Sequence, residues 1–329
     1  MKKIVYVTNT QYIRKDIAEG ILAEKFDLRF VDAVTEDDLI LKCADANAIV
    51  ITDPDVTAKA MDGMPNLEYI SGAIIGFNTV DVEAAKQRGI PVSNNPKYCT
   101  NEVADHAAAF ILSLARRIID YNEEVHVKKM YNALASGYPI HRLSTQTLGL
   151  IGFGSISRAL TIRMKGFGMN IIAYDPYVTK EQGILAGVEI VDMPELCKRS
   201  DIISLHLPHM KSTDKIINKS VFDMMERKPI FVNCARGGVV DEDALVEAVK
   251  EGKVSLAGLD VVTNERVPIE DNPLTKQKNI IMTPHAAFYS IEARIEQQEL
   301  GCKHVLWFYE GKYDQLPIVN GVKPQAAKV

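Results

Sequence analysis

Short runs of apolar residues, many of them β-branched, alternate with amphipathic stretches along almost the whole chain. This alternation predicts βαβ units and parallel sheets. The first part of the chain predicts five strands, at Ile4–Val7, Leu28–Val31, Ala48–Thr52, Tyr69–Ala73 and Pro91–Ser93. Helical stretches such as Ile13–Glu24 and Val82–Arg88 separate them. This part therefore predicts a small flavodoxin-like sheet.

A second set of strands follows a long predicted helix. Apolar residues recur at helical spacing from Asn101 to Tyr121, which predicts one continuous helix. After a polar stretch over residues 136–146, strands are predicted at Leu148–Ile151, Ile171–Tyr174, Val188–Ile190, Ile202–Leu207, Ile230–Asn233, Leu256–Val261 and Ile280–Thr283. The chain then becomes helical again from Ser290 to about Tyr309.

The last apolar segment, Leu316–Val319, has no sheet of its own to join. We therefore expect the C-terminal part to return to the first domain. The predicted α/β fold has two Rossmann/flavodoxin-like, doubly wound parallel-sheet domains separated by a cleft. One domain is predicted to comprise residues 1–99 and 290–329, and the other residues 100–289.

Composition excludes several classes of protein. Hydrophobic residues make up 47% of the 329 residues, enough for two domain cores. The net charge is −5 and basic residues cluster only in pairs, which argues against a nucleic-acid partner. No apolar run approaches the roughly 18 residues that span a bilayer, and no signal peptide is visible. The five cysteines are scattered without a CxxC pair, so we expect a cytoplasmic protein with no metal site.

A buried strand leads directly into the run Gly152-Phe153-Gly154-Ser155-Ile156-Ser157. The first glycine permits a tight turn, the second lets the backbone approach a pyrophosphate, and the next helix directs free N–H groups at it. Ser157 replaces the third glycine of the dinucleotide fingerprint. A second strand ends at Asp175, where a carboxylate can accept both ribose hydroxyls of NAD and repel a 2′-phosphate. The alternative is a tight turn followed by a surface aspartate.

Three further residues come just after predicted strands: Arg236, Glu265 and His285. Open α/β sheets bind ligands at the carboxyl ends of their strands. A guanidinium can hold a carboxylate bidentately, and a histidine can supply the proton that a ketone needs when hydride reduces it. A carboxylate beside the histidine favours the charged ring and orients it. Taken one at a time, these residues could instead be a surface ion pair, a solvated acid and a structural histidine.

These segments resemble the D-isomer-specific 2-hydroxyacid dehydrogenase family over nearly the whole chain. The matching pieces are LGLIGFGSISRAL from Leu148, IIAYDPYV from Ile171, DIISLHLP from Asp201, FVNCARGGVVDEDALVEA from Phe231, LDVVTNERVP from Leu259 and MTPHAAFYS from Met282. The run KYCTNEVADH from Lys97 is similar to the branch of C-terminal binding proteins and their bacterial dehydrogenase relatives. The resemblance implies an enzyme that interconverts a 2-keto acid and a D-2-hydroxy acid with NAD.

The resemblance also implies roles for individual residues. Arg236, Glu265 and His285 would be the catalytic set, and the loop Ile74-Ile75-Gly76 would receive the substrate carboxylate together with Arg236. Asp260 would hold the nicotinamide carboxamide. The remaining cofactor contacts would come from Val103, Gly152, Gly154, Ser155, Ile156, Asp175, Pro176, His206, Leu207, Pro208, Thr213, Cys234, Ala235 and His285.

Some positions depart from the family pattern. The family often has Arg-Ala-Gly at the positions of Gly72, Ala73 and Ile74, so this chain lacks that arginine and that glycine but keeps Gly76. A loop with Ile74 and Ile75 suits an apolar or compact substrate tail, which argues against 3-phosphoglycerate. Arg266 replaces the proline usual after the catalytic glutamate. Phe288 stands where corepressors of the branch carry tryptophan, which disfavours a corepressor.

Three functions therefore stay open. The first is a dehydrogenase acting on a small 2-keto or 2-hydroxy acid. The others are an NAD(H)-sensing, corepressor-like binding protein and a phosphoglycerate dehydrogenase. We also expect a homodimer, paired through the helix from Asn101 to Tyr121, whose apolar residues include Phe110, Ile111 and Leu114.

Overall fold

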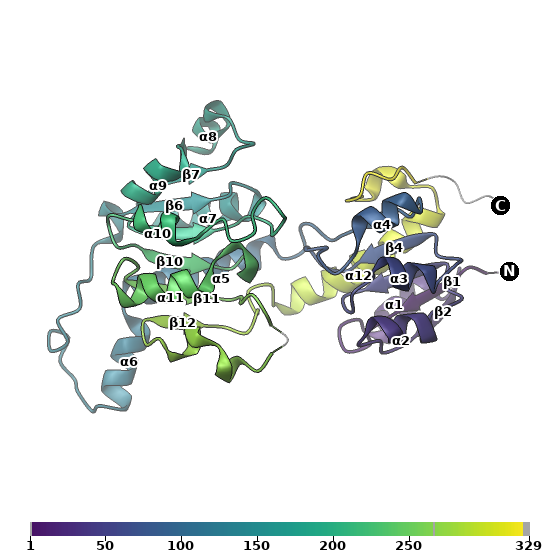
Figure 1. Ribbon diagram of the computed structural model, residues 1–329, viewed down its shortest axis with the longest axis horizontal. Coiled ribbons are helices and arrows are strands. Elements are labelled where there is room, and N and C mark those ends of the chain that lie inside the picture. The colour runs from purple at the N-terminus through teal and green to yellow at the C-terminus, as the bar shows by residue number, and fades with distance from the viewer. Residues whose placement is uncertain (1, 266, 325–329) are drawn as a thin grey trace. The chain divides into compact units, whose positions relative to one another are not determined.

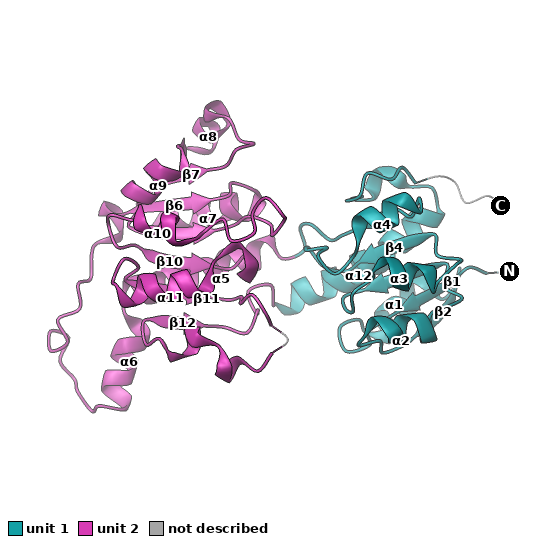
Figure 2. Ribbon diagram, in the orientation of Figure 1, with its two compact units in different colours: residues 1–98, 290–329 teal, residues 99–289 magenta. Residues whose placement is uncertain are grey.

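The computed structural model describes residues 2–265 and 267–324, so Arg266 lies outside the described residues. The chain divides into two compact units (Figure 2). Unit 1 comprises residues 1–98 and 290–329, and unit 2 comprises residues 99–289. Among the described residues, no helix is long and apolar enough to cross a membrane.

Unit 1 is built on a parallel sheet, which has five strands in the described residues, in the order β2-β1-β3-β4-β5 (Figure 1). The strands are β1 (Ile4–Val7), β2 (Asp27–Phe30), β3 (Ala48–Ile51), β4 (Tyr69–Gly72) and β5 (Val92–Ser93). The helices are α1 (Lys15–Leu22), α2 (Glu36–Lys42), α3 (Ala58–Asp62), α4 (Val82–Gln87) and α12 (Ile291–Tyr309). This strand order is that of flavodoxin-like sheets, as predicted.

Alternate residues of each strand in unit 1 enter two separate cores. Ile49 and Ile51 pack with helices α2, α3 and α4, whereas Ala48 and Val50 pack with α1 and α12. Both faces of the sheet are therefore covered, as buried parallel sheets require. The C-terminal segment returns to this sheet, where Ile318 pairs antiparallel with Ser93.

Unit 2 contains a second parallel sheet, with the described strands in the order β12-β11-β10-β9-β6-β7-β8. The strands are β6 (Thr147–Ile151), β7 (Asn170–Tyr174), β8 (Glu189–Ile190), β9 (Ile202–Leu205), β10 (Ile230–Asn233), β11 (Leu256–Leu259) and β12 (Ile280–Met282). The helices are α5 (Thr100–Ala115), α6 (Ile118–His126), α7 (Ser155–Gly166), α8 (Lys180–Ala186), α9 (Met193–Arg199), α10 (Lys219–Asp223) and α11 (Glu242–Lys250). The strand order reverses between β6 and β9, which makes the Rossmann switch point where dinucleotides bind.

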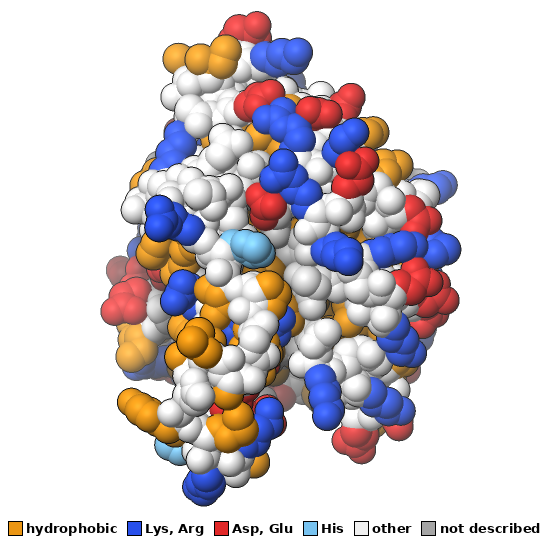
Figure 3. Space-filling view, turned by 90° about the vertical axis from the view of Figure 1, so that its left-hand side faces the viewer, with side chains coloured by type: hydrophobic (Ala, Val, Ile, Leu, Met, Phe, Trp, Pro, Cys, Tyr) orange, Lys and Arg blue, Asp and Glu red, His pale blue; other side chains and the backbone are white. Residues whose placement is uncertain are grey.

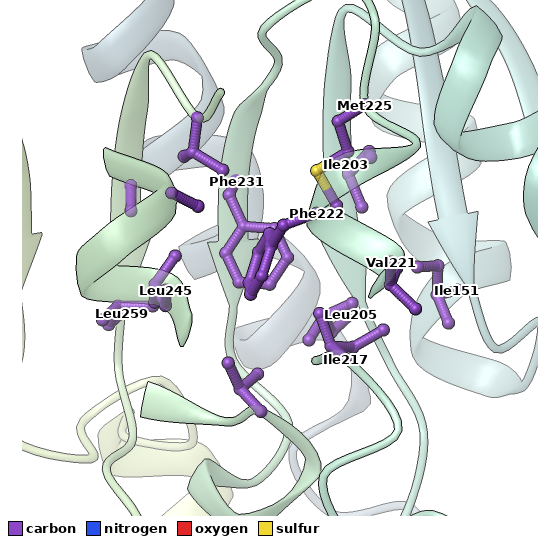
Figure 4. Packing of buried hydrophobic residues seen from close by; sticks show 14 of the residues in the cluster. Ile151, Ile203, Leu205, Ile217, Val221, Phe222, Met225, Phe231, Leu245 and Leu259 are labelled. Carbon is purple, nitrogen blue, oxygen red and sulfur yellow. The ribbon is translucent and has the colours of Figure 1, made fainter. Parts of the chain in front are cut away.

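The core of unit 2 on one face of its sheet is aromatic and aliphatic (Figure 4). Phe222 of α10 lies edge-on to Phe231 of β10, with ring centroids 5.6 Å apart. Leu245 of α11 packs into the same cluster. Helices α5 and α7 pack against each other, and α5 also lies against β10 and β11. The strands that carry the candidate site residues are thus held between two layers of helices.

The prediction of one helix from Asn101 to Tyr121 is wrong. Helix α5 ends at Ala115, and Arg117 adopts a left-handed backbone with φ of 55° before α6 begins. The apolar spacing continues across this break, so periodicity alone could not detect it. Phe110, Ile111 and Leu114 are buried in unit 2 and are core residues, not the dimer contacts that we expected them to be.

Candidate active site

The candidate residues of unit 2 gather at one edge of its sheet. Each follows a strand: Gly152 after β6, Asp175 after β7, His206 after β9, Arg236 after β10, Asp260 and Glu265 after β11, and His285 after β12. Because the strands are parallel, their carboxyl ends meet at the same edge.

The glycine turn after β6 leaves no room for a side chain at its first position. Gly152 has a φ of +89°, and a Cβ there would lie 2.6 Å from the carbonyl oxygen of His206. The hydroxyl of Ser157, at the position of the third fingerprint glycine, donates to the carbonyl oxygen of Gly152 at 2.6 Å. The serine therefore stabilises the turn that a glycine would merely permit.

The same turn has the free donors that a pyrophosphate needs. Gly154 is the N-cap of α7, and no side chain caps that helix. Within the described residues, no group accepts a hydrogen bond from the backbone N–H of Gly154, Ser155 or Ile156. Helix N-termini of this kind bind anions. The site therefore fits the phosphates of a dinucleotide.

Asp175 ties the end of β7 to the glycine turn. One carboxylate oxygen accepts from the backbone N–H of Phe153 at 2.8 Å, and the other accepts from Tyr177 at 2.9 Å. Pro176 beside it is exposed. The carboxylate thus lies next to the phosphate-binding turn, where the ribose of a bound NAD would meet it.

The other expected cofactor residues have varied surroundings. His206 bonds Ser204 at 2.9 Å, and burial lowers its pKa to about 4, so its ring is neutral near pH 7. Val103, Leu207 and Cys234 are buried, and burial raises the pKa of the Cys234 thiol. Thr213 closes its own turn by donating to the carbonyl oxygen of Pro208 at 2.7 Å.

Arg236 is positioned by the last residue of β10. The buried side chain of Asn233 donates to the carbonyl oxygen of Arg236 and accepts from the N–H of Ala235, both at 2.9 Å. The guanidinium donates to the carbonyl oxygen of Ala235 at 2.7 Å. At Gly237, a Cβ would lie 2.0 Å from the carbonyl carbon of Val262, so only glycine lets the chain turn after Arg236.

His285 and Glu265 form a hydrogen-bonded pair. The Nδ1 atom of His285 lies 2.8 Å from a carboxylate oxygen of Glu265, and both side chains are about two-fifths exposed, at 39% and 42%. Partial burial opposes ionisation of Glu265. Even so, the hydrogen bond from His285 and the charges of His285 and Arg236 hold the pKa of Glu265 below its ordinary value. The carboxylate is therefore ionised near pH 7.

The backbone of His285 is held in an unusual conformation. Its φ is 50°, in the left-handed region that non-glycine residues rarely adopt. Its N–H donates to the carbonyl oxygen of Asp260 at 2.8 Å. The buried carboxylate of Asp260 accepts from the N–H groups of Ala286 and Ala287, at 2.8 and 2.9 Å. Asp260 thus fixes the turn that presents the imidazole.

Two residues that the sequence did not single out complete this arrangement. The hydroxyl of Thr283 donates to Asp260 at 2.5 Å, and the Nε2 atom of His106 on α5 lies 2.9 Å from the same hydroxyl. Thr283 follows β12, but His106 comes from a helix distant in sequence. The sequence places His106 in a predicted helix, and this position does not indicate a contact with Thr283.

The expected substrate loop of unit 1 follows β4. Three of its carbonyl groups are engaged: those of Ala73, Ile74 and Ile75 accept from Gln297, Asn95 and Asn94, at 2.7, 2.8 and 2.6 Å. By contrast, none of the described groups accepts from the N–H of Ile74, Ile75 or Gly76. The loop therefore has free donors that suit a carboxylate.

Comparisons with known proteins agree with this geometry. Residues 108–287 match the family model "D-isomer specific 2-hydroxyacid dehydrogenase, NAD binding domain". The chain belongs to the D-isomer-specific 2-hydroxyacid dehydrogenase family. The predicted family and NAD-binding fold are thus confirmed.

Individual relatives have different substrates. A D-3-phosphoglycerate dehydrogenase of Methanocaldococcus jannaschii is 39% identical over 88% of this chain, but the chain spans only 55% of that protein. A glyoxylate reductase of Korarchaeum cryptofilum is 36% identical over 83% of this chain and 82% of its own length. The crystal structure of an Aquifex aeolicus D-lactate dehydrogenase with NAD and lactic acid matches 97% of this chain and 99% of that one, with a TM-score of 0.85 and 30% identity.

The described residues contain no group of three or more His, Cys, Asp or Glu side chains arranged to hold a metal ion.

Proposed function

We propose that this protein is an NAD-dependent D-2-hydroxyacid dehydrogenase that acts on a small 2-keto acid. The observation that carries the proposal is the His285–Glu265 pair, at 2.8 Å, on the same sheet edge as Arg236 and the glycine turn. A protein that binds a dinucleotide but catalyses no reaction has no need of an imidazole paired with a carboxylate.

In this proposal, bound NADH supplies the hydride, and the protein supplies orientation and a proton. The free N–H groups of Gly154, Ser155 and Ile156 would hold the pyrophosphate, and Asp175 the adenine ribose. Asp260, Cys234 and Ala235, with Val103, Thr213 and the segment His206–Pro208, would complete the cofactor contacts. Asp260 is already bonded to the turn at His285, so its main contribution is to position that turn.

The proposed catalytic steps belong to three side chains. Arg236 would bind the substrate carboxylate and polarise the adjoining carbonyl. His285 would give its proton to the developing alkoxide in reduction and take it back in oxidation. Glu265 would stabilise the imidazolium. In unit 1, the free backbone N–H groups of Ile74, Ile75 and Gly76 would bind a carboxylate.

Turnover of a keto-acid panel tests this proposal. NADH oxidation is followed at 340 nm with glyoxylate, pyruvate, branched and aromatic 2-keto acids and phosphohydroxypyruvate. We expect turnover with at least one non-phosphorylated keto acid and none that exceeds it with phosphohydroxypyruvate. Preference for phosphohydroxypyruvate would instead support the phosphoglycerate dehydrogenase alternative. NADH binding without any turnover would support the sensor alternative.

We further propose that the protein is a cytoplasmic homodimer. Exposed apolar residues gather on α6 and the segment after it, namely Ile118, Ile119, Val127, Tyr131 and Leu134. In Figure 3, which looks at the end of unit 2, hydrophobic side chains (orange) gather on the lower left of the surface. Tyr131 is 95% exposed and Leu134 86% exposed. Isolated exposed apolar residues are ordinary, but a group like this marks an interaction surface.

Light scattering tests the dimer directly. We expect a dimer mass at micromolar concentration, and a shift to monomer when Tyr131 and Leu134 are both replaced by Ser. A monomer mass for the unchanged protein would contradict the proposal.

A further inference from the structure

We infer that Arg294 is a specificity residue that binds a second anionic group on the substrate, so that the preferred substrates are 2-keto dicarboxylates. This inference rests on the proposed function, because it concerns the tail of the keto acid. It begins with the way α12 is joined to the carboxyl edge of the sheet in unit 1.

Two buried glutamines of α12 connect the helix to the loops at that edge. The side chain of Gln297 donates to the carbonyl oxygen of Ala73. The backbone carbonyl oxygen of Gln297 accepts from the side chain of Asn95 at 2.8 Å. Gln298 accepts from the N–H of Arg14 at 2.7 Å and donates to the carbonyl oxygen of Arg294 at 2.6 Å. The first turns of α12 are therefore fixed against the loops that follow β1, β4 and β5.

The side chain of Arg294 is held at this same edge. Its guanidinium donates to the side chain of Gln297 at 2.5 Å and to the carbonyl oxygen of Tyr12 at 2.7 Å. It also lies over the ring of Tyr12, 5.4 Å from the ring centroid. The side chain of Gln297 bonds both Arg294 and Ala73. It therefore links the guanidinium directly to the loop after β4, which has the free N–H groups.

All of these partners are neutral, and no described acid forms an ion pair with Arg294. Among the described arginines, several pair with acids, and Arg116, Arg142 and Arg158 are exposed to water. Only Arg236 and Arg294 are half-buried without an ion pair to an acid in the described part of the chain, and the charge of Arg236 still acts on Glu265, whose pKa it lowers.

A half-buried guanidinium fixed by neutral acceptors is suited to an anionic ligand, because a planar group oriented in advance loses little entropy on binding. The loop from Ile74 to Gly76 offers neutral N–H donors, and Arg294 adds a full charge on the same face of unit 1. A keto acid with a second carboxylate has a group for each. The apolar Ile74 and Ile75 side chains would then line the carbon chain between the two anionic ends.

The test compares dicarboxylates with apolar isosteres. Rates of NADH oxidation are measured with oxaloacetate against 4-methyl-2-oxopentanoate, and with 2-oxoglutarate against 5-methyl-2-oxohexanoate. We expect kcat/KM to favour at least one dicarboxylate by roughly tenfold or more, the scale of a charge-assisted hydrogen bond. Arg294→Gln should remove that preference while leaving the apolar isosteres within about twofold. Arg294→Lys should retain part of it.

Two further measurements separate the possible outcomes. Arg14→Gln removes an equal charge from unit 1, but one already paired with Asp16, and should leave the preference unchanged. Calorimetric titration of the unliganded protein with the dicarboxylates tests the anion site without turnover, and affinity should fall in Arg294→Gln. If no keto acid is reduced but this difference in binding persists, the proposed function fails and the anion site stands.

A preference for the apolar isosteres in the unchanged protein would overturn the inference. An equal loss with dicarboxylates and isosteres in Arg294→Gln would also overturn it, because a merely structural role affects both.

Discussion

The two sheets present opposite kinds of chemistry at their carboxyl edges. In unit 2 the edge carries ionisable side chains: Asp175, Arg236, Glu265 and His285, each delivered by the end of a different strand or the loop after it. In unit 1 the loop after β4 offers free backbone N–H groups at this edge. Three carbonyl groups of that loop accept hydrogen bonds from Asn94, Asn95 and Gln297. In the proposed function, unit 2 would move a proton, and unit 1 would recognise the shape and the charge of the substrate.

The largest expected effect comes from the proton donor in unit 2. His285→Ala should lower kcat for keto-acid reduction by roughly 100-fold or more, the scale of a lost general acid. The KM for NADH should change little, because the glycine turn is untouched. Stopped-flow and steady-state kinetics check this. A kcat within tenfold of that of the unchanged protein would show that His285 is not the general acid.

The matching change in unit 1 should act on binding instead. Gln297→Met keeps the size of a buried side chain but leaves the carbonyl of Ala73 without its donor and removes one of the two acceptors of Arg294. We expect the KM for the keto acid to rise by about tenfold, the scale of one lost buried hydrogen bond, with a smaller change in kcat. A loss confined to kcat would break the contrast between the two edges.

The turn at His285 should show an intermediate effect. Thr283→Val removes the hydroxyl that joins His106 to Asp260, whereas Thr283→Ser keeps it. We expect kcat to fall about fivefold in the valine variant, because one hydrogen bond to a buried carboxylate is lost. Hydrogen exchange at Ala286 and Ala287 should accelerate in that variant alone. Equal behaviour of the two variants would show that the hydroxyl does not position His285.

An effect of similar size is expected on the choice of cofactor. Asp175→Ala should weaken the preference for NADH over NADPH by roughly fivefold, since no carboxylate would then face a 2′-phosphate. Because Asp175 also bonds Phe153, NADH affinity should fall somewhat as well. The ratio of kcat/KM values for the two cofactors measures the effect. An unchanged ratio would assign the discrimination to another residue.

The sequence predicts the site residues of unit 2 better than it predicts those of unit 1. Gly152, Arg236 and His285 each follow a short, mainly apolar segment that predicts a strand, so their shared edge follows from the parallel order of the strands. The fold class was predicted for the same reason. Strand ends were predicted two residues too long at both β9 and β11, where apolar residues continue into the turn.

The parts that sequence could not predict depend on residues far apart in the chain. His106, Arg294 and Gln297 lie on helices, where a polar residue is ordinarily assigned to the solvent side. Only folding brings His106 to Thr283 and Gln297 to Ala73. The break at Arg117 is also local and conformational, and it leaves the spacing of apolar residues intact.

The pH dependence of Glu265→Gln tests the central claim most directly. Keto-acid reduction needs a protonated imidazole, so its rate should hold at low pH and fall as pH rises, while hydroxy-acid oxidation should show the opposite limb. The low pKa of Glu265 keeps it anionic across this range, and its charge favours the imidazolium. Replacing it by Gln preserves the shape and removes the charge. The falling limb of reduction should move to lower pH with NADH affinity nearly unchanged, and an unmoved limb would contradict the proposed role of Glu265.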